Sequence, residues 1–149
     1  MSSLMDSLPP ELVRSLLSEQ IQPGAVFFLY DQAVQKNKYI LILGIDTNKI
    51  WVSSLYISTQ INKNVIRTLE QRDLQFKIKA SDYDFLDHDS WINASSFLRR
   101  EINNLVDIFI SKKCAYQGQI NSRDFDYLRS IMAESKLFSK AEKKELGLI

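Results

Sequence analysis

The sequence predicts an α+β fold, with strands clustered in the middle of the chain and helices at its two ends. Leucines recur at helical spacing before the breaker pair Pro23 and Gly24. Apolar runs and period-two alternation then fill the middle of the chain, and helical spacing returns in the last third. The 149 residues fit one domain, with 1–21 as an N-terminal helix, 23–95 as the strand-rich part and 96–149 as mainly helical.

The first two thirds of the chain hold one expected helix and five expected strands. Prolines are tolerated in a first helical turn, so the helix begins near Pro9 and Pro10 and ends near Gln20. The strand at residues 38–45 is apolar almost throughout, which is typical of burial on both faces. The expected strands are Ala25–Tyr30, Lys38–Ile45, Ile50–Tyr56, Leu74–Ile78 and Ser90–Ala94, with a polar loop at Asp31–Asn37.

The last third is expected to be helical, with one short strand. Apolar residues from Leu98 to Phe109 have helical spacing, and Ser95 or Ser96 can cap the start of that helix. A strand at residues 114–120 follows. Asn121 or Ser122 then caps a second helix, and Ser139 with Glu142 forms a capping box for a third, closed by Gly147.

Composition excludes several classes of function. Lys+Arg is 19 and Asp+Glu is 18, so the net charge of +1 gives no general attraction to nucleic acid or membrane. Cys114 is the single cysteine, which rules out an internal disulfide framework. Residues 1–20 lack the pattern of a signal peptide, and the longest apolar runs are far too short to span a membrane. We therefore expect a cytoplasmic protein with no membrane partner.

The sequence predicts neither a cofactor nor a metal. The four glycines are isolated, so phosphate-binding and dinucleotide-binding loops are absent. An acidic cluster runs from Asp82 to Asp89 and includes His88, the single histidine. Aspartates of this kind are typical of turns, and a loop is the favoured interpretation. A metal site made of His88 and two carboxylates is the alternative.

Small groups of lysines are the candidate binding residues for nucleic acid. Lys77 and Lys79 are two positions apart and share one face of their strand, and Lys36 and Lys38 lie in the preceding loop region. These lysines could follow a phosphate backbone, and Trp51 could stack on a single-stranded base. The alternative is a solvated sheet face with Trp51 packed at its rim.

One stretch resembles a known family. Residues 23–29 (PGAVFFL) open like the first strand of the PemK/MazF-like toxins. The polar loop ending at Lys38, the buried strand from Tyr39, the segment WVSS at 51–54 and DSWIN at 89–93 follow in the same order. The similarity is one of order and pattern over residues 23–110. It implies a small SH3-like β-barrel over 23–95, with the N-terminal helix and the C-terminal helices added to it.

The resemblance also implies site residues and a chemistry. Members of the family are metal-independent endoribonucleases that cut single-stranded RNA and are neutralised by an antitoxin. Their catalytic Arg falls by position on Lys38, and their Ser or Thr falls on Ser53 or Ser54. Lys38 would then stabilise charge on the phosphate. Lys36, Lys77, Lys79 and Trp51 would bind the RNA.

Two functions follow as hypotheses. The first is a non-catalytic component of a toxin–antitoxin or phage-defence module, which binds a protein partner through its barrel and the leucines of its first helix. The second is a metal-independent endoribonuclease toxin that cleaves single-stranded RNA. The expected partners are accordingly an antitoxin or other protein, single-stranded RNA, or a second copy of the chain as a homodimer.

Overall fold

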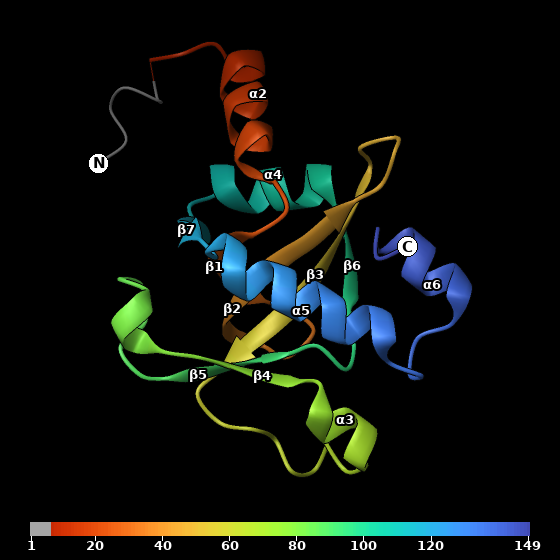
Figure 1. Ribbon diagram of the computed structural model, residues 1–149. Helices are drawn as coiled ribbons and strands as arrows, with labels where there is room; N and C mark the ends of the chain where they lie inside the picture. Colours follow the sequence, from red (N-terminus) through yellow and green to blue (C-terminus); the bar gives the residue numbers. More distant parts are fainter. Residues whose placement is uncertain (1–6) are drawn as a thin grey trace.

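The computed structural model describes residues 7–149 and shows an α+β fold built on one seven-stranded antiparallel sheet (Figure 1). The strands are β1 (Ala25–Asp31), β2 (Lys36–Ile45), β3 (Trp51–Ser58), β4 (Gln75–Ile78), β5 (Ser90–Asn93), β6 (Leu98–Glu101) and β7 (Cys114–Gln119). The helices are α2 (Pro10–Gln20), α3 (Leu69–Asp73), α4 (Ile102–Ile110), α5 (Ser122–Glu134) and α6 (Lys140–Glu145), with a 3-10 turn η1 (Ala80–Asp82). The expected α+β class is thus confirmed.

Strand β3 occupies the centre of the sheet and pairs with three strands. The order is β4-β5-β3-β2-β1-β7, and β6 also pairs with β3. On one edge β3 pairs with β2 along most of its length. On the other edge it pairs with β6 over residues 51–54 and with β5 at residues 57 and 58. Neither of those two strands pairs with Tyr56, and this gap in the pairing positions the site described below.

The sheet is open, so the closed barrel implied by the family resemblance does not form. Strands β4 and β7 are its two end strands. Segments that follow these two end strands are joined by the side chain of Tyr83. Tyr83 donates a hydrogen bond to Asp124 at 2.5 Å and accepts one from the backbone N–H of Asn121 at 3.2 Å. The start of α5 therefore connects to the segment after β4 without closing the ladder.

Two hydrophobic cores lie on opposite faces of the sheet. Because side chains alternate along a strand, Ile40 and Ile42 face the core that includes Leu105 of α4, while Leu41 and Leu43 face the core that includes Leu128 of α5. All four strand residues are fully buried, as the sequence predicts for a strand enclosed on both sides. Figure 1 shows α5 lying across the sheet, with α4 and α2 together at one end.

The predicted helix over residues 98–109 is wrong at its start. Residues 98–101 form β6, and the helix α4 begins only at Ile102. Helical spacing continues back through Leu98, but pairing of β6 with Trp51–Ser54 satisfies the backbone of this segment in a sheet instead. Glu101, and neither Ser95 nor Ser96, is the N-cap of α4. Of the two alternatives for α5, Asn121 is the cap, and the predicted cap at Ser139 is confirmed; each of these side chains accepts a backbone N–H three residues later.

Helix α2 is held against α4 by an ion pair and by Leu17. Arg14 Nη1 lies 2.7 Å from Asp107 Oδ1, and Leu17 packs against the α4-side core. Leu12 and Leu16 remain exposed on the same helix. Across residues 7–149, none of the helices combines the length and the apolar character needed to cross a membrane.

Candidate nucleic-acid interface

Lys38 is a half-buried cation on the sheet face that α4 packs against. Its Nζ donates a hydrogen bond to Ser58 Oγ at 3.3 Å and lies 5.5 Å from the centre of the Tyr56 ring. Within residues 7–149, Lys38 forms no ion pair with a carboxylate. Burial lowers the pKa of Lys38 below its usual 10.5; the charge of Lys36 acts in the same direction, and that of Asp31 opposes both.

A buried carboxylate lies beside Lys38. Asp31 is almost fully buried at the end of β1, where its Oδ2 accepts hydrogen bonds from Tyr56 Oη at 2.5 Å and Arg100 Nη2 at 2.8 Å. Burial by itself would raise the pKa of Asp31. The hydrogen bonds from Tyr56 and Arg100, together with the charge of Arg100, outweigh burial and hold the pKa below 3.8. Asp31 is therefore ionised at neutral pH.

The same network fixes the Tyr56 ring and the Arg100 guanidinium. Arg100 Nε donates to Ser54 Oγ at 2.9 Å, and Ser54 in turn donates to the carbonyl of Leu98 at 3.0 Å. Burial and the hydrogen bond to Asp31 raise the pKa of Tyr56 above 10.0, so its phenol stays protonated and keeps donating. The Arg100 guanidinium carbon lies 5.8 Å from the Tyr56 ring centre, so two cations flank this aromatic side chain.

The β1–β2 hairpin explains why Asp31 and Lys38 come together. Asp31 Oδ1 accepts the backbone N–H of Ala33 at 2.8 Å, which stabilises the start of the turn. Gln35 completes the turn with a φ of 56°. The chain then returns as β2, with Lys36 opposite Asp31 and Lys38 opposite Leu29. The Asp31 side chain therefore both stabilises the turn and holds the hydroxyl of Tyr56 in place.

A row of polar and aromatic side chains continues from Lys38 across three strands. Ser58 of β3 pairs with Trp91 of β5, and Trp91 pairs with Lys77 of β4. Lys77 Nζ lies 5.9 Å from the centre of the Trp91 ring and 3.8 Å from Asp89 Oδ2. This face of the sheet therefore has a lysine at each end of the row, with Ser58 and Trp91 between the two lysines.

Two pockets open on either side of Lys38 and Ser58. The first has a volume of about 230 Å³ and is lined by Val34, Lys38, Tyr56, Ser58, Gln60, Ile61, Asn62, Val65, Ile66, Gln75, Trp91, Asn93 and Ser96. The second, of about 290 Å³, includes Lys36, Asn37, Thr59 and His88 in its lining. Lys38 and Ser58 line both pockets, whose other lining residues are polar and apolar alike. The second pocket also reaches Tyr39, Ile57 and Leu86 of the core on the α5 side. The two pockets together are called the groove at Lys38.

Ser53 and Ser54 do not lie beside Lys38. They are consecutive in β3, so their side chains lie on opposite faces of the sheet. Ser54 shares the face of Lys38 but pairs with Ile42, four residues along β2, and its hydroxyl is occupied by Arg100 and Leu98. The hydroxyl that the fold brings to Lys38 belongs to Ser58.

The predicted RNA-binding residues fall in different places. Lys36 lines the pocket on the far side of Lys38, and Lys77 joins the row at Trp91. Lys79 is exposed between β4 and η1. Trp51 stacks under Arg99, whose guanidinium carbon is 5.0 Å from the ring centre, and lines a separate pocket of about 530 Å³ with Arg100 and Lys113.

His88 and Cys114 have no neighbours that suggest metal or thiol chemistry. In the part of the chain that the structure describes, no group of three or more His, Cys, Asp or Glu side chains could hold a metal ion. Cys114 is buried, and burial raises the pKa of its thiol to about 12, although the charge of Arg100 opposes this. The thiol is therefore protonated at neutral pH.

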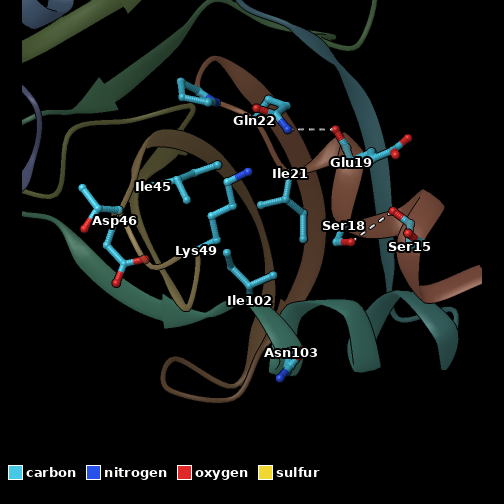
Figure 2. Close-up of a pocket in the computed structure, with 12 residues that line it drawn as sticks. Ser15, Ser18, Glu19, Ile21, Gln22, Ile45, Asp46, Lys49, Ile102 and Asn103 are labelled. Atoms are coloured by element: carbon cyan, nitrogen blue, oxygen red, sulfur yellow. Dashed lines mark hydrogen bonds between the residues drawn. The ribbon is translucent and has the colours of Figure 1, made fainter. Parts of the chain in front are cut away.

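A larger pocket of about 610 Å³ lies between the end of α2, the β2–β3 turn and the start of α4. Figure 2 shows Lys49 at this pocket together with Ile21, Ile45 and Ile102. Its lining contains no aromatic side chain and a single cation. The groove at Lys38 therefore has more of the features that single-stranded nucleic acids use, which are stacking surfaces and clustered cations.

No protein-family model matches the sequence, and no curated protein matches it at a significant level.

Sequence reasoning missed Asp31, Trp91 and Arg100 as site residues. Phe27, Leu29 and Asp31 alternate on one face of β1, so a charge on the buried side was visible in the pattern. Arg100 was not singled out because residues 98–101 were predicted to be helical. Trp91 was assigned to its strand correctly, but its partners Ser58 and Lys77 come from distant parts of the chain.

Proposed function

We propose that the protein binds single-stranded RNA on the sheet face around Lys38. The observation that carries the proposal is the row of Lys38, Ser58, Trp91 and Lys77 across four strands, with Tyr56 beside it and a pocket above it. Aromatic rings stack on bases of any identity, each contributing about 1–3 kcal/mol, and lysines between them neutralise phosphates.

Local charge favours an anionic ligand here although the whole chain is nearly neutral. Lys38 has no carboxylate partner in the described part of the chain, and its half-buried position strengthens any contact with a phosphate. The resemblance to the PemK/MazF-like toxins favours RNA over DNA as the ligand. The proposal includes a distant evolutionary relation between this chain and those toxins. It also includes a relation between this open sheet and their SH3-like barrel.

Lys38→Ala is expected to weaken binding to single-stranded RNA about tenfold, as for the loss of one hydrogen bond to a charged group. The loss should be similar for all sequences, and the slope of log affinity against log salt should fall by about 0.7. Fluorescence anisotropy with short labelled RNA of mixed sequence measures both. Lys144→Ala is the matched control, because Lys144 is an exposed lysine of α6, which lies on the other side of the sheet from Lys38. Equal affinity of wild type and Lys38→Ala would refute the site.

The same samples test the endoribonuclease hypothesis. Incubation with the RNA in EDTA, followed by mapping of the new ends, distinguishes binding from cleavage. In a cleaving protein, Lys38 would stabilise the phosphate, and Ser58, at 3.3 Å, would take the place that the resemblance gives to Ser53 or Ser54. Discrete cuts that disappear in Lys38→Ala would support catalysis. Stable binding without cuts would leave a non-catalytic RNA-binding protein.

Binding of a protein partner is the second candidate, and it is favoured by the exposed leucines of α2. Leu12 and Leu16 are 44% and 39% exposed on a helix whose other side packs against α4. Apolar side chains presented at this spacing suit a helix-to-groove contact with another protein, such as an antitoxin or a second copy of the chain.

Self-association through α2 is tested by Leu16→Glu. We expect this change to convert a dimer to a monomer while leaving the free energy of unfolding of the monomer within about 0.5 kcal/mol, because the side chain is exposed. Sedimentation velocity measures the mass in solution. A wild-type protein that remains monomeric at high concentration would contradict the homodimer and leave a different protein as the partner.

A further inference from the structure

Two amide side chains that line the 230 Å³ pocket are locked in one orientation. Asn93 of β5 and Gln75 of β4 are paired across their strands, and both line the pocket. Asn93 Oδ1 accepts from the backbone N–H of Ser95 at 3.1 Å, from Ser95 Oγ at 2.5 Å and from Gln75 Nε2 at 2.9 Å. A backbone N–H can only donate, so the atom facing it must be the oxygen of Asn93.

The orientation of Gln75 follows by the same reasoning. Its Nε2 lies 3.1 Å from the backbone carbonyl of Gln71, which can only accept. The amide nitrogen of Gln75 is therefore the donor to both Gln71 and Asn93. This leaves Asn93 Nδ2 as a donor and Gln75 Oε1 as an acceptor, neither with a partner in the described part of the chain.

The other walls of the pocket suit a flat ring. Trp91 and Tyr56 provide aromatic surface, and Ile61, Val65 and Ile66 provide apolar surface from the loop after β3. The volume is below the range of about 300–1,000 Å³ that is typical for drug-sized ligands, so the pocket suits a single small heterocycle. Lys38 also lines this pocket, so its charge is available to a phosphate attached to that ring.

We infer that this pocket takes one unstacked base of a single-stranded RNA, whose edge is read by Asn93 Nδ2 and Gln75 Oε1 while Lys38 holds the adjacent phosphate. The inference rests on the proposed RNA binding and adds base selectivity to it. Each base has hydrogen-bond donors and acceptors on its exposed edges, and single-stranded RNA is recognised through them. Because both amides are locked, the donor and the acceptor keep a fixed order, which distinguishes a base with an amino group beside a ring acceptor from a base with a carbonyl beside a ring N–H.

Asn93→Asp tests the inference with little change of shape. The aspartate keeps the oxygen that accepts from Ser95 and Gln75, but it replaces the donor with an acceptor. The pocket then offers two acceptors, which match the adjacent N1–H and N2–H donors of guanine. We expect the wild-type protein to enrich one base at one position of a random short RNA pool at least about fivefold. We expect Asn93→Asp to shift that preference to guanine.

Gln60→Glu is the matched control, because it adds a negative charge to the lining of the same pocket at a side chain outside the locked pair. It should lower affinity without moving the preference. A wild-type protein that binds the pool with no enriched position would overturn the base pocket while leaving RNA binding intact. The same holds if Asn93→Asp folds normally and keeps the wild-type preference. No binding to the pool at all would overturn the proposed function itself.

Discussion

Asp31→Ala is expected to lower the free energy of unfolding by about 3–5 kcal/mol, as for a buried ion pair that loses one partner. The Asp31 side chain is 2% exposed and that of Arg100 is 14% exposed, so water cannot replace the carboxylate. Of its side-chain hydrogen bonds within residues 7–149, Arg100 would keep the one to Ser54, and Tyr56 Oη would lose its acceptor. Urea unfolding of both proteins measures the difference.

Asp107→Ala is the control for that result. Its partner is Arg14, at 2.7 Å, but both side chains are well exposed, and such surface pairs contribute at most about 1 kcal/mol. If Asp31→Ala destabilised the protein no more than Asp107→Ala does, the buried network would not have the role described. If the protein binds RNA as proposed, loss of Tyr56 order in Asp31→Ala would also be expected to weaken that binding, since Tyr56 lines the groove.

The pH dependence of stability supplies a second test of the Asp31 network. The pKa of Asp31 is lower in the folded protein than its ordinary 3.8. Its contribution is therefore fully present above that ordinary value and is lost as the pH falls through the folded-state pKa. Between about pH 4 and pH 2, the wild-type protein should lose stability more steeply than Asp31→Ala. Parallel curves would contradict an ionised Asp31.

Leu128→Ala is expected to cost about 2–5 kcal/mol, the usual range for removing a buried leucine and leaving a cavity. Leu128 is fully buried on α5 and packs in the core on the α5 side of the sheet with Met132. The midpoint of urea unfolding measures this change. Leu12→Ala, at an exposed leucine of α2, should change the free energy by no more than about 0.5 kcal/mol. Similar effects at the two leucines would mean that α5 does not cover the sheet as described.

Short-range features of the fold could be predicted because their causes lie within a few residues. The Asn121 and Ser139 caps each depend on a side chain and a backbone N–H three residues later. The alternation of polar and apolar residues from Gln75 to Ile78 correctly predicted β4. The apolar run from Ile40 to Leu43 correctly predicted β2. Residues 98–101 were predicted wrongly because their local spacing fits a helix, whereas their backbone partners lie almost fifty residues earlier.

The candidate site was only partly predictable for the same reason. Lys38 was named through the family resemblance, and in the structure it lines both pockets of the groove. Its hydroxyl neighbour, Ser58, could not be distinguished from Ser53 and Ser54 without the register of β2 on β3. Nothing local could show that Arg100 and Tyr56 would meet the carboxylate of Asp31.

The α+β class, the central strands and the starts of α5 and α6 could be predicted from the sequence, because each follows from periodicity or capping within one segment. The tertiary structure alone decided that the sheet stays open, that β3 pairs with both β5 and β6, and that Lys38, Trp91 and the Asp31 network share one face. These outcomes depend on pairing register and on packing between segments far apart in the chain. Burial of a charge and the locking of an amide arise only when such segments come together.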